Sequence, residues 1–400
     1  MDKCDVLIVG GGIAGLSAAV TLCSESDLRV MLVEREKIGS NRTTPAVFWE
    51  TVHEFGLEDS VLEKYTGFIR HSPLGAYAHF DFGRAMLAAL DYQRACDILH
   101  KRAMNNGLGL TKAGAVDFSP GVPDPGKPLV IRLDTGDRIQ SEVLIDASGY
   151  VQWAAKLLHI KGSGYYSHCF GELLTGCSVE DSSSFRFLGP TRRYGNGGGW
   201  LYPAGLKSVS IGYSRVTPEA TENSSGLIAG YEAAKREFQP YADWVKEGVR
   251  ERVELGTVPV GRIGRFFADR ILILGDAAGQ AHPWVVEGCR PALNNGRLCA
   301  QVVLDAFAKE RFDHAFLSSY ERQWNKTNRE RFWRTASVAE LIWNQSDEDW
   351  DSVIARCGRL SPEQMLLVMR DNQASLFHRI YAVAGHIRRS IAKRMRMPTP

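Results

Sequence analysis

Several features that define other protein classes are missing from this sequence of 400 residues. It has no run of about 18 apolar residues, so no transmembrane helix is predicted. A predicted strand begins at Cys4, which leaves no room for a signal peptide before it. The 8 cysteines include no C-x-x-C pair, which argues against a zinc site or a redox pair. We therefore expect a cytoplasmic protein without a metal site, whose cysteines are mostly small buried side chains.

The sequence also lacks a strong excess of charge. A formal charge of +2 is not the basic surplus that general nucleic-acid binding needs, so no nucleic-acid partner is expected. With 44% hydrophobic and 24% charged residues, the composition is that of a soluble globular protein. The length suggests two or three domains.

The most informative pattern lies in the first forty residues. Residues 4–9 are predicted as a short buried strand that runs into a glycine-rich segment at 10–15, and residues 16–22 have helical composition. A second predicted strand, 28–33, ends in Glu34. This order of strand, glycines, helix, strand and acid is the dinucleotide-binding βαβ fingerprint.

Each position of this fingerprint has a physical role. Gly10 permits the tight turn, Gly12 lets backbone N–H groups approach a pyrophosphate, and Gly15 lets helix and strand pack closely. Glu34 can accept a hydrogen bond from a ribose 2′-hydroxyl and disfavours a 2′-phosphate. The sequence therefore predicts a site for FAD or NAD.

Two more predicted strands end in small and acidic residues. Residues 143–145 precede Asp146-Ala147-Ser148-Gly149, and residues 270–274 precede Gly275-Asp276-Ala277-Ala278-Gly279. Between them, residues 165–215 alternate in a β-type pattern, which indicates a second, mostly antiparallel domain. Helices are predicted over 45–57, 90–106, 229–247 and 291–307, and beyond residue 312, where Ser361 is a candidate helix cap.

In this order, the glycine triad and the two later strand ends resemble the motifs of the FAD-dependent superfamily of aromatic hydroxylases, flavin halogenases, lycopene cyclases and geranylgeranyl reductases. The resemblance covers roughly residues 4–310. It implies an α/β fold (α+β overall), with a Rossmann-like FAD-binding domain, an inserted antiparallel β-sheet substrate domain and a helical C-terminal region. The expected limits are 1–75, 90–160 and 255–310 for the discontinuous FAD-binding domain, 76–89 and 161–254 for the substrate domain, and 311–400 for the helical region.

The resemblance also implies which residues bind FAD. Asp276 would accept from the ribityl hydroxyls, although an aspartate at this place could instead cap a turn. Either Gln93 or Arg94 would contact the flavin phosphates or the ribityl chain. Arg42 is a further candidate for a phosphate or flavin contact, with an ordinary solvated arginine as the equal alternative. The expected FAD-binding residues are Gly10, Gly12, Ile13, Ala14, Gly15, Glu34, Arg35, Arg42, Gln93, Arg94, Gly149, Gly275, Asp276, Pro283 and Gly288.

Among the branches of the superfamily, the sequence is most similar to the geranylgeranyl reductases. The segment Gly199-Trp200-Leu201-Tyr202-Pro203 looks like their Tyr-x-Trp-x-Phe-Pro motif, but it lacks the tyrosine, and Ala204 replaces the common lysine. The halogenase motif Trp-x-Trp-x-Ile-Pro is missing, and residues 146–149 replace the Asp-Gly motif of aromatic hydroxylases.

The candidate substrate and catalytic residues follow from this comparison. Phe48, Trp49, Trp200 and Tyr202 are expected to line an apolar cavity, with core packing as the alternative. His282, Glu287 and Cys289 flank the expected flavin loop and are candidate proton donors, although a lone histidine or cysteine is often structural. A helix start near Cys289 predicts a lowered thiol pKa.

The expected protein is thus an enzyme, an FAD-dependent oxidoreductase that acts on a lipophilic or aromatic small molecule, most like the double-bond reduction of geranylgeranyl reductases by flavin hydride transfer. The alternative is a monooxygenase or halogenase-like tailoring enzyme that uses a C4a-(hydro)peroxyflavin. A second alternative is a non-catalytic flavoprotein that relays electrons. No second nucleotide fingerprint is evident, so electrons would come from transiently bound NAD(P)H or from a partner reductase.

The C-terminus is basic and amphipathic. Its cations alternate with apolar residues, so it could make a peripheral contact with an anionic membrane. A solvated helix end, favoured by the helix dipole, is the alternative. The cations are Arg388, Arg389, Lys393, Arg394 and Arg396.

Overall fold

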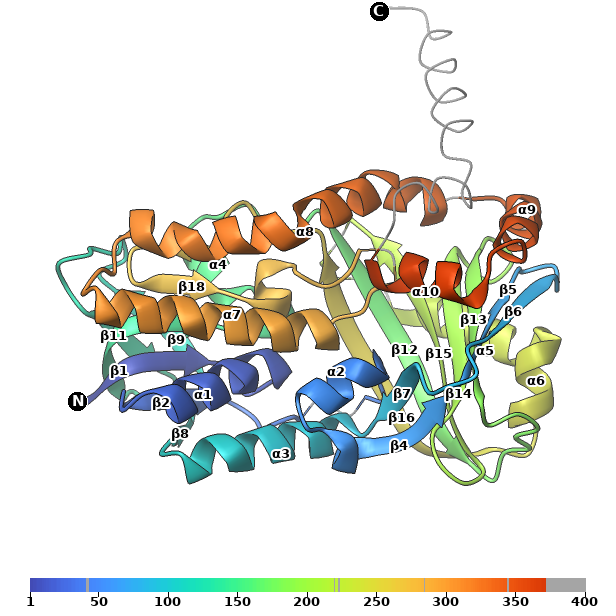
Figure 1. The fold of residues 1–400 in the computed structure, drawn as a ribbon, viewed down its shortest axis with the longest axis horizontal. Helices are drawn as coiled ribbons and strands as arrows, with labels where there is room; N and C mark the ends of the chain where they lie inside the picture. The colour runs from blue at the N-terminus through green and yellow to red at the C-terminus, as the bar shows by residue number, and fades with distance from the viewer. Residues whose placement is uncertain (41–42, 219, 222–223, 284, 344, 372–400) are drawn as a thin grey trace, which may run out of the picture.

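The computed structural model of the protein describes residues 1–40, 43–218, 220–221, 224–283, 285–343 and 345–371; at 329–342 and at 371 it describes the backbone alone. Two large sheets lie towards opposite ends of the molecule, and long helices extend along it (Figure 1). This mixed α/β arrangement confirms the predicted fold class. Arg42 and the basic residues from Arg388 onward lie outside the described residues.

The first sheet has eight strands and contains the βαβ unit. Strand β1 pairs in parallel with β2 and with β11, and β11 pairs in parallel with β18. The middle strands of a parallel sheet are buried on both faces, which explains why residues 6–8 form an unbroken apolar run that is fully buried. The strands are β1 (Asp2–Val9), β2 (Val30–Glu34), β8 (Gly109–Lys112), β9 (Ala115–Ser119), β10 (Leu129–Leu133), β11 (Arg138–Asp146), β17 (Phe267–Ala268) and β18 (Ile271–Ile273).

The helices of this part pack against one another on one side of the sheet. Helix α1 (Ile13–Glu25) contacts both α3 (Tyr92–Asn105) and α7 (Cys289–Ala308). Helix α7 thus packs beside the start of α1 although it lies much later in the chain. Ser17 Oγ donates to the carbonyl oxygen of Leu293 at 2.7 Å, and these two residues are 276 positions apart in the sequence.

The second sheet is a seven-stranded one in the order β16-β12-β15-β14-β13-β5-β6, mostly antiparallel. Helices α5 (Ser224–Glu237) and α6 (Gln239–Val245) cover one of its faces through a cluster of buried aromatic and aliphatic side chains. The strands are β5 (Gly67–His71), β6 (Tyr77–Asp81), β12 (Tyr165–Thr175), β13 (Ser184–Thr191), β14 (Gly197–Pro203), β15 (Ser208–Thr217) and β16 (Val249–Val260). The expected domain limits stay a prediction.

A small three-stranded sheet lies between the large ones. It consists of β3 (Ala46–Phe48), β4 (Val61–Tyr65) and β7 (Leu87–Leu90), and the short helix α2 (Trp49–Glu54) follows β3. The prediction of one helix over 45–57 is therefore wrong for its first residues, because Ala46–Phe48 pairs with β7.

The predicted helix over 229–247 is interrupted. Phe238 has an extended backbone, with φ −83° and ψ 101°, and Pro240 occupies the first turn of α6. Proline is tolerated in a first turn, where its missing N–H is not needed, but not inside a continuous helix.

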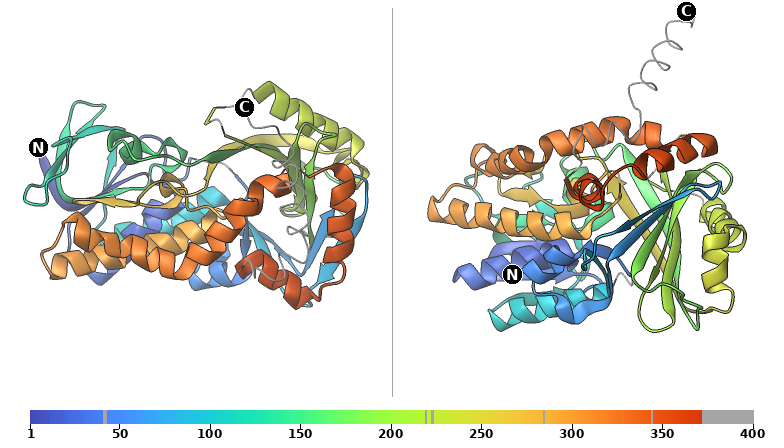
Figure 2. Two further views of the ribbon diagram at one scale, coloured as in Figure 1. Left: turned by 90° about the horizontal axis from the view of Figure 1, so that it is seen from above. Right: turned by 45° about the vertical axis from the view of Figure 1, so that its right-hand side comes forward.

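The C-terminal part that the structure describes is helical, as predicted. Helix α8 (His314–Trp343) packs on α7 and on β17 and β18, while α9 (Asp347–Cys357) and α10 (Pro362–Asp371) contact β6 (Figure 2). The expected cap is confirmed, because Ser361 Oγ accepts from the backbone N–H of Gln364 at 3.2 Å.

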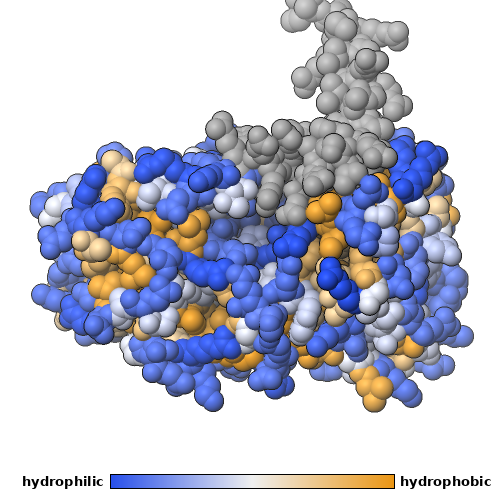
Figure 3. All heavy atoms as spheres, in the orientation of Figure 1, coloured by the Kyte–Doolittle hydropathy of each residue, from blue (hydrophilic) through white to orange (hydrophobic). Residues whose placement is uncertain are grey.

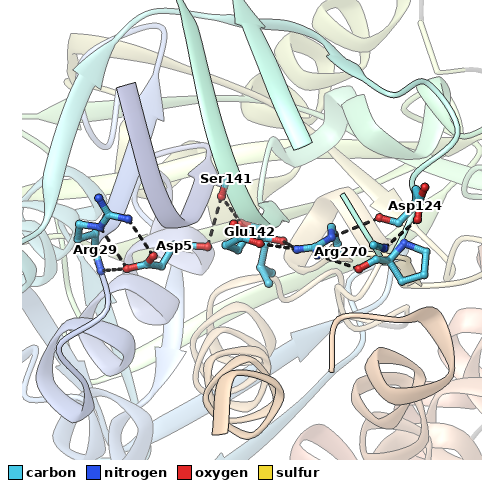
Figure 4. Close-up of polar contacts among 9 residues, drawn as sticks. Asp5, Arg29, Asp124, Ser141, Glu142 and Arg270 are labelled. Atoms are coloured by element: carbon cyan, nitrogen blue, oxygen red, sulfur yellow. Dashed lines mark hydrogen bonds and ion pairs between the residues drawn. The ribbon is translucent and has the colours of Figure 1, made fainter. Parts of the chain in front are cut away.

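At one edge of the first sheet, a single arginine links strand β11 to the loop between β9 and β10. Arg270 has φ +60° and is 5% exposed; its guanidinium donates to Glu142 at 2.7 Å and to the carbonyl oxygen of Pro125 at 2.7 Å (Figure 4). On the same edge Arg29 pairs with Asp5 (Figure 4).

Polar residues are interspersed with apolar ones over the face drawn in Figure 3. Within the described ranges, none of the helices combines the length and the hydropathy that crossing a bilayer requires.

The buried His71 makes the stability of this fold depend on pH. Burial, and then the charge of Arg186, lower the pKa of His71 from 6.5 to about 4. The unfolded chain therefore binds a proton that the folded chain does not bind between about pH 6.5 and 4, so stability is lost as pH falls through this window. At about 1.4 kcal/mol for each pKa unit, we expect a loss of about 3 kcal/mol between pH 7 and 4 from this residue.

Urea unfolding at several pH values measures the effect. We expect His71→Phe to reduce the pH dependence, whereas His79→Gln, a change at an exposed histidine of the neighbouring strand, should leave it in place. Equal curves for wild type and His71→Phe would contradict the assignment.

Candidate functional site

The glycine turn after β1 lies directly against the segment that follows β11. Gly10 has φ +112°, and a Cβ there would lie 2.3 Å from the carbonyl oxygen of Ala147. A Cβ at Gly15 would lie 2.2 Å from the carbonyl oxygen of Gly10. Only glycine fits these positions, so strand end and helix meet through backbone atoms.

The first turn of α1 is open at one side. Gly12 is the N-cap residue and offers no side-chain cap, and the N–H of Ile13 donates to the hydroxyl of Tyr92 at 3.2 Å. Gly12, Ile13 and Ala14 line a cavity. The unpaired N–H groups and the helix dipole at such an end favour an anion.

Glu34 lies beside this turn at the end of β2. One carboxylate oxygen accepts from the N–H of Gly11 at 2.7 Å, and the other accepts from the N–H of Glu36 at 2.7 Å. Glu34 also lines the cavity, so its remaining lone pairs can accept from a ligand hydroxyl. Arg35 lines the same end but its side chain is exposed.

The strand end before Asp276 reaches the same place. After β18 the chain forms a short turn, Gly275–Ala278, in which Gly275 has φ +65° and lies so close to α1 that a Cβ would be 2.8 Å from that of Ala14. Asp276 lines the cavity, and burial raises its pKa to about 6. A Cβ at Gly288, at the start of α7, would be 3.5 Å from an Asp276 carboxylate oxygen.

These residues open onto one continuous cavity of about 750 Å³. From the glycine turn it passes the segments 43–46 and 285–289 and reaches the seven-stranded sheet. The far part is lined mainly by aromatic side chains: Phe48, Phe68, Phe185, Phe187, Trp200, Tyr202 and Trp350.

Trp200 lies flat on the seven-stranded sheet because two neighbouring strands carry glycine beneath it. A Cβ at Gly212 would lie 2.1 Å from the indole ring, and a Cβ at Gly171 would lie 3.2 Å from it. Trp200 Nε1 donates to Ser210 Oγ at 3.2 Å. The indole thus forms part of the cavity wall in a fixed orientation.

The other three candidate substrate residues differ in position. Tyr202 lines the cavity and stacks on Phe185 with ring centroids 4.8 Å apart. Phe48 lines it too, and the guanidinium of Arg290 lies 5.0 Å from its ring. Trp49 is not among the lining residues; its ring packs under Lys64 Nζ at 3.9 Å.

The three candidate proton donors are also placed differently. Glu287 lines the cavity, and both its oxygens accept from Arg290, at 2.8–3.1 Å. The backbone N–H of His282 donates to the carbonyl oxygen of Glu287 at 2.8 Å, and its Nδ1 accepts from the N–H of Val285 at 3.4 Å. His282 is not among the cavity-lining residues.

Cys289 lines the cavity at the start of α7. Burial, and then the charge of Glu287, raise the pKa of its thiol well above the usual range. The expected lowering by the helix start is therefore wrong, because desolvation and a neighbouring carboxylate outweigh the helix dipole.

The remaining predicted cofactor residues fall into two groups. Gly149 lines the cavity beside the glycine turn, and Pro283 is buried in the loop before α7. Gln93 and Arg94 are not among the lining residues; the Gln93 amide donates to the carbonyl oxygen of Ile38 at 2.7 Å, and Arg94 is exposed.

Sequence reasoning missed Tyr92, the residue just before this pair. Its hydroxyl meets the first turn of α1, and it lines the cavity. The signal was Asp91, which caps α3 by accepting from the N–H of Arg94 at 3.0 Å and so fixes which residue of the first turn points to the glycines.

The residues present fit FAD. The start of α1 is an anion site that suits a pyrophosphate, and Glu34, at the end of the next strand, suits a ribose. Asp276, at the mouth of the apolar chamber, suits a polyol chain that ends in a flat ring. The exclusion of side chains at Gly10 and Gly15 keeps the approach to the helix start open.

Comparison with known proteins agrees with this reading. Residues 5–105 match the family described as FAD dependent oxidoreductase. The chain is 25% identical over 396 residues to digeranylgeranylglycerophospholipid reductase 1 of Methanococcoides burtonii, covering 94% of this chain and 92% of the relative. It is 25% identical over 370 residues to digeranylgeranylglycerophospholipid reductase 2 of Methanothermobacter thermautotrophicus, covering 88% and 91%.

Solved structures share the fold. A geranylgeranyl bacteriochlorophyll reductase-like protein of Thermoplasma acidophilum superposes with a TM-score of 0.81 at 18% identity, covering 93% of this chain and 98% of the other. The flavin-dependent brominase Bmp2 gives 0.71 at 17% identity, covering 95% and 93%. A mutant of the halogenase PltM, solved in complex with FAD, gives 0.69 at 16% identity, covering 95% and 86%. The resemblance seen in the sequence is thereby confirmed, and the protein is an FAD-dependent oxidoreductase.

Proposed function

We propose that this oxidoreductase reduces a carbon–carbon double bond of a lipophilic substrate, most like the reaction named for the geranylgeranyl reductases that it resembles. The observation that carries the proposal is the continuous cavity. It runs from the glycine turn and Glu34, the nucleotide end of the cavity, to a chamber with mainly aromatic walls. Such a chamber favours an apolar substrate, because burial of apolar surface drives binding.

The nucleotide-end residues would bind the cofactor. Gly10, Gly12 and the first turn of α1 would receive the pyrophosphate, Glu34 the adenosine ribose, and Asp276 the ribityl chain. Gly288 would let the start of α7 come close to the ring. When bound and reduced, FAD supplies a hydride, and NAD(P)H or a partner reductase would restore the reduced form.

The chain itself must supply the proton for the second carbon. Cys289 keeps its proton near neutral pH, because burial raises its pKa. Glu287 is ion-paired with Arg290, and His282 is not among the cavity-lining residues. Among the three candidates, Cys289 is therefore the one that lines the cavity with a bound proton; because a thiol with a raised pKa is a weak acid, it would protonate only a strongly basic carbon.

The second candidate function is that of an oxygen-using monooxygenase or halogenase. The similarity in fold to Bmp2 and to PltM favours it. Both reactions require the chamber to exclude water, so its aromatic walls fit either.

Anaerobic turnover separates the two functions. Dithionite-reduced protein mixed without oxygen with a geranylgeranyl glycerophospholipid in detergent should yield a product two hydrogens heavier for each bond reduced, as mass spectrometry would show. Product formed only when oxygen is admitted would overturn the reductase proposal, and flavin reduction without any change in the lipid would support the electron relay.

Trp200→Ala should reduce turnover more than FAD content. Loss of the aromatic wall should lower kcat/KM at least about tenfold, since a buried aromatic contact is worth about 1.5 kcal/mol. Gly212→Ala, which retains the tryptophan residue but adds a Cβ that would displace its ring, should have the same effect. Equal losses of bound FAD and of turnover would instead make Trp200 a packing residue.

Asp276→Asn should weaken FAD binding yet stabilise the FAD-free protein. The pKa of Asp276 is raised from 3.8 to about 6, so the folded state favours the proton and stability falls as pH rises through that window. At pH 8 the neutral side chain should raise the free energy of unfolding by up to about 3 kcal/mol. Loss of a charge-assisted hydrogen bond should weaken FAD binding about tenfold.

Thermal unfolding of FAD-free protein and fluorescence titration with FAD measure the two effects. Asp27→Asn, at an exposed position, is the matched control. Lower stability of FAD-free Asp276→Asn at pH 8 would refute the expected cost of the buried charge.

A further inference from the structure

Thr44 joins the nucleotide-binding part of the chain to the seven-stranded sheet at the middle of the cavity. It precedes β3 and is 2% exposed, and with Thr43, Pro45 and Ala46 it lines the cavity. Residues far along the chain contact its backbone and its hydroxyl.

On one side, the contacts come from β16. Glu254, 5% exposed, accepts from the Thr44 N–H at 3.2 Å and from the Thr44 hydroxyl at 2.6 Å. Arg252 donates to the same hydroxyl at 2.7 Å and to Glu254 at 2.9 Å. Charge-assisted hydrogen bonds of this kind are stronger and more directional than neutral ones.

On the other side, the contact comes from β14. The Tyr202 hydroxyl donates to the carbonyl oxygen of Thr44. The phenol ring is itself fixed, because it stacks on Phe185 at 4.8 Å and meets the edge of Tyr65 at 6.0 Å. Thr44 is therefore attached to two strands that are separated in the sheet by β15 and β12.

The strand register places these contacts around Trp200. Tyr202 pairs with Ser210, which pairs with Leu173, which pairs with Arg252, so Tyr202 and Arg252 belong to one cross-strand row. The next row on the same face runs from Trp200 across Gly212 and Gly171 to Glu254. Thr44 thus lies over the face of the sheet on which the indole ring rests.

We propose that Glu254 and Tyr202 are positioning residues of this enzyme: by holding Thr44 from two strands, they set the distance between residues 43–46 and the Trp200 ring, and with it the placement of substrate and flavin ring. The catalytic part of this proposal rests on the proposed function, since it requires the substrate to bind in this chamber. Errors of about 1 Å in such a placement can slow a reaction about 100-fold.

Thr44→Val tests the attachment with little change of volume. It removes the hydroxyl that donates to Glu254 and accepts from Arg252, whereas the conservative Thr44→Ser retains that hydroxyl. Glu254→Gln removes the charge, and Tyr202→Phe removes only the donor to the Thr44 carbonyl. These last two variants keep the test available if Thr44→Val does not fold.

Three measurements on the FAD-loaded full chain distinguish positioning from structural support. The first is the visible circular dichroism of bound FAD, which reports the surroundings of its ring. The second is FAD affinity together with the unfolding midpoint. The third is kcat and KM for a geranylgeranyl glycerophospholipid in detergent.

We expect Thr44→Val, Glu254→Gln and Tyr202→Phe to alter the visible circular dichroism and to lower kcat about 10- to 100-fold, with KM and FAD affinity within about threefold of wild type. Thr44→Ser should restore the spectrum and most of kcat. A wild-type spectrum in all three variants, or a loss of kcat that only parallels losses of FAD affinity and unfolding midpoint, would overturn the proposal. If the wild type does not reduce the lipid, the proposed function fails, while the spectra still decide whether Thr44 is held as described.

Discussion

The close approach that glycine permits at the ends of β1, β11 and β18 is the constraint on which the site depends. At Gly10, Gly15 and Gly275 an added Cβ would come within 2.2–2.8 Å of another atom. Three segments from the beginning, middle and later part of the chain can meet only because these positions carry no side chain. The carboxylates of Glu34 and Asp276 reach one cavity as a consequence of that meeting.

The same constraint explains what could be predicted from sequence. A glycine that is required by contact leaves a visible pattern, and so does a buried parallel strand, which reads as an apolar run. The first strand, the glycine turn, the helix after it and the strand before Asp276 were all recognisable for that reason. So was the cap at Ser361, because its signal is local and lies within a few residues of the helix it begins.

What could not be predicted depends on partners that are distant in sequence. Residues 46–48 form a strand because β7 lies beside them, and a segment of three residues is too short for its composition to decide between strand and helix. The thiol of Cys289 is governed by the burial and the carboxylate around it, not by the helix start that its sequence position suggests. Thr44 has no recognisable motif at all, since the side chains that hydrogen-bond to it, on Tyr202, Arg252 and Glu254, all come from the second half of the chain.

The two glycines beneath Trp200 have a wider consequence. Gly171 and Gly212 belong to different strands, and neither lies in the segments around the glycine turn, Glu34 and Asp276 that are proposed to bind FAD. The depth of the aromatic chamber is thus encoded separately from the cofactor site. Relatives or engineered variants could therefore accept bulkier or slimmer molecules by exchanging small residues in the floor of this sheet, with the redox machinery inherited unchanged.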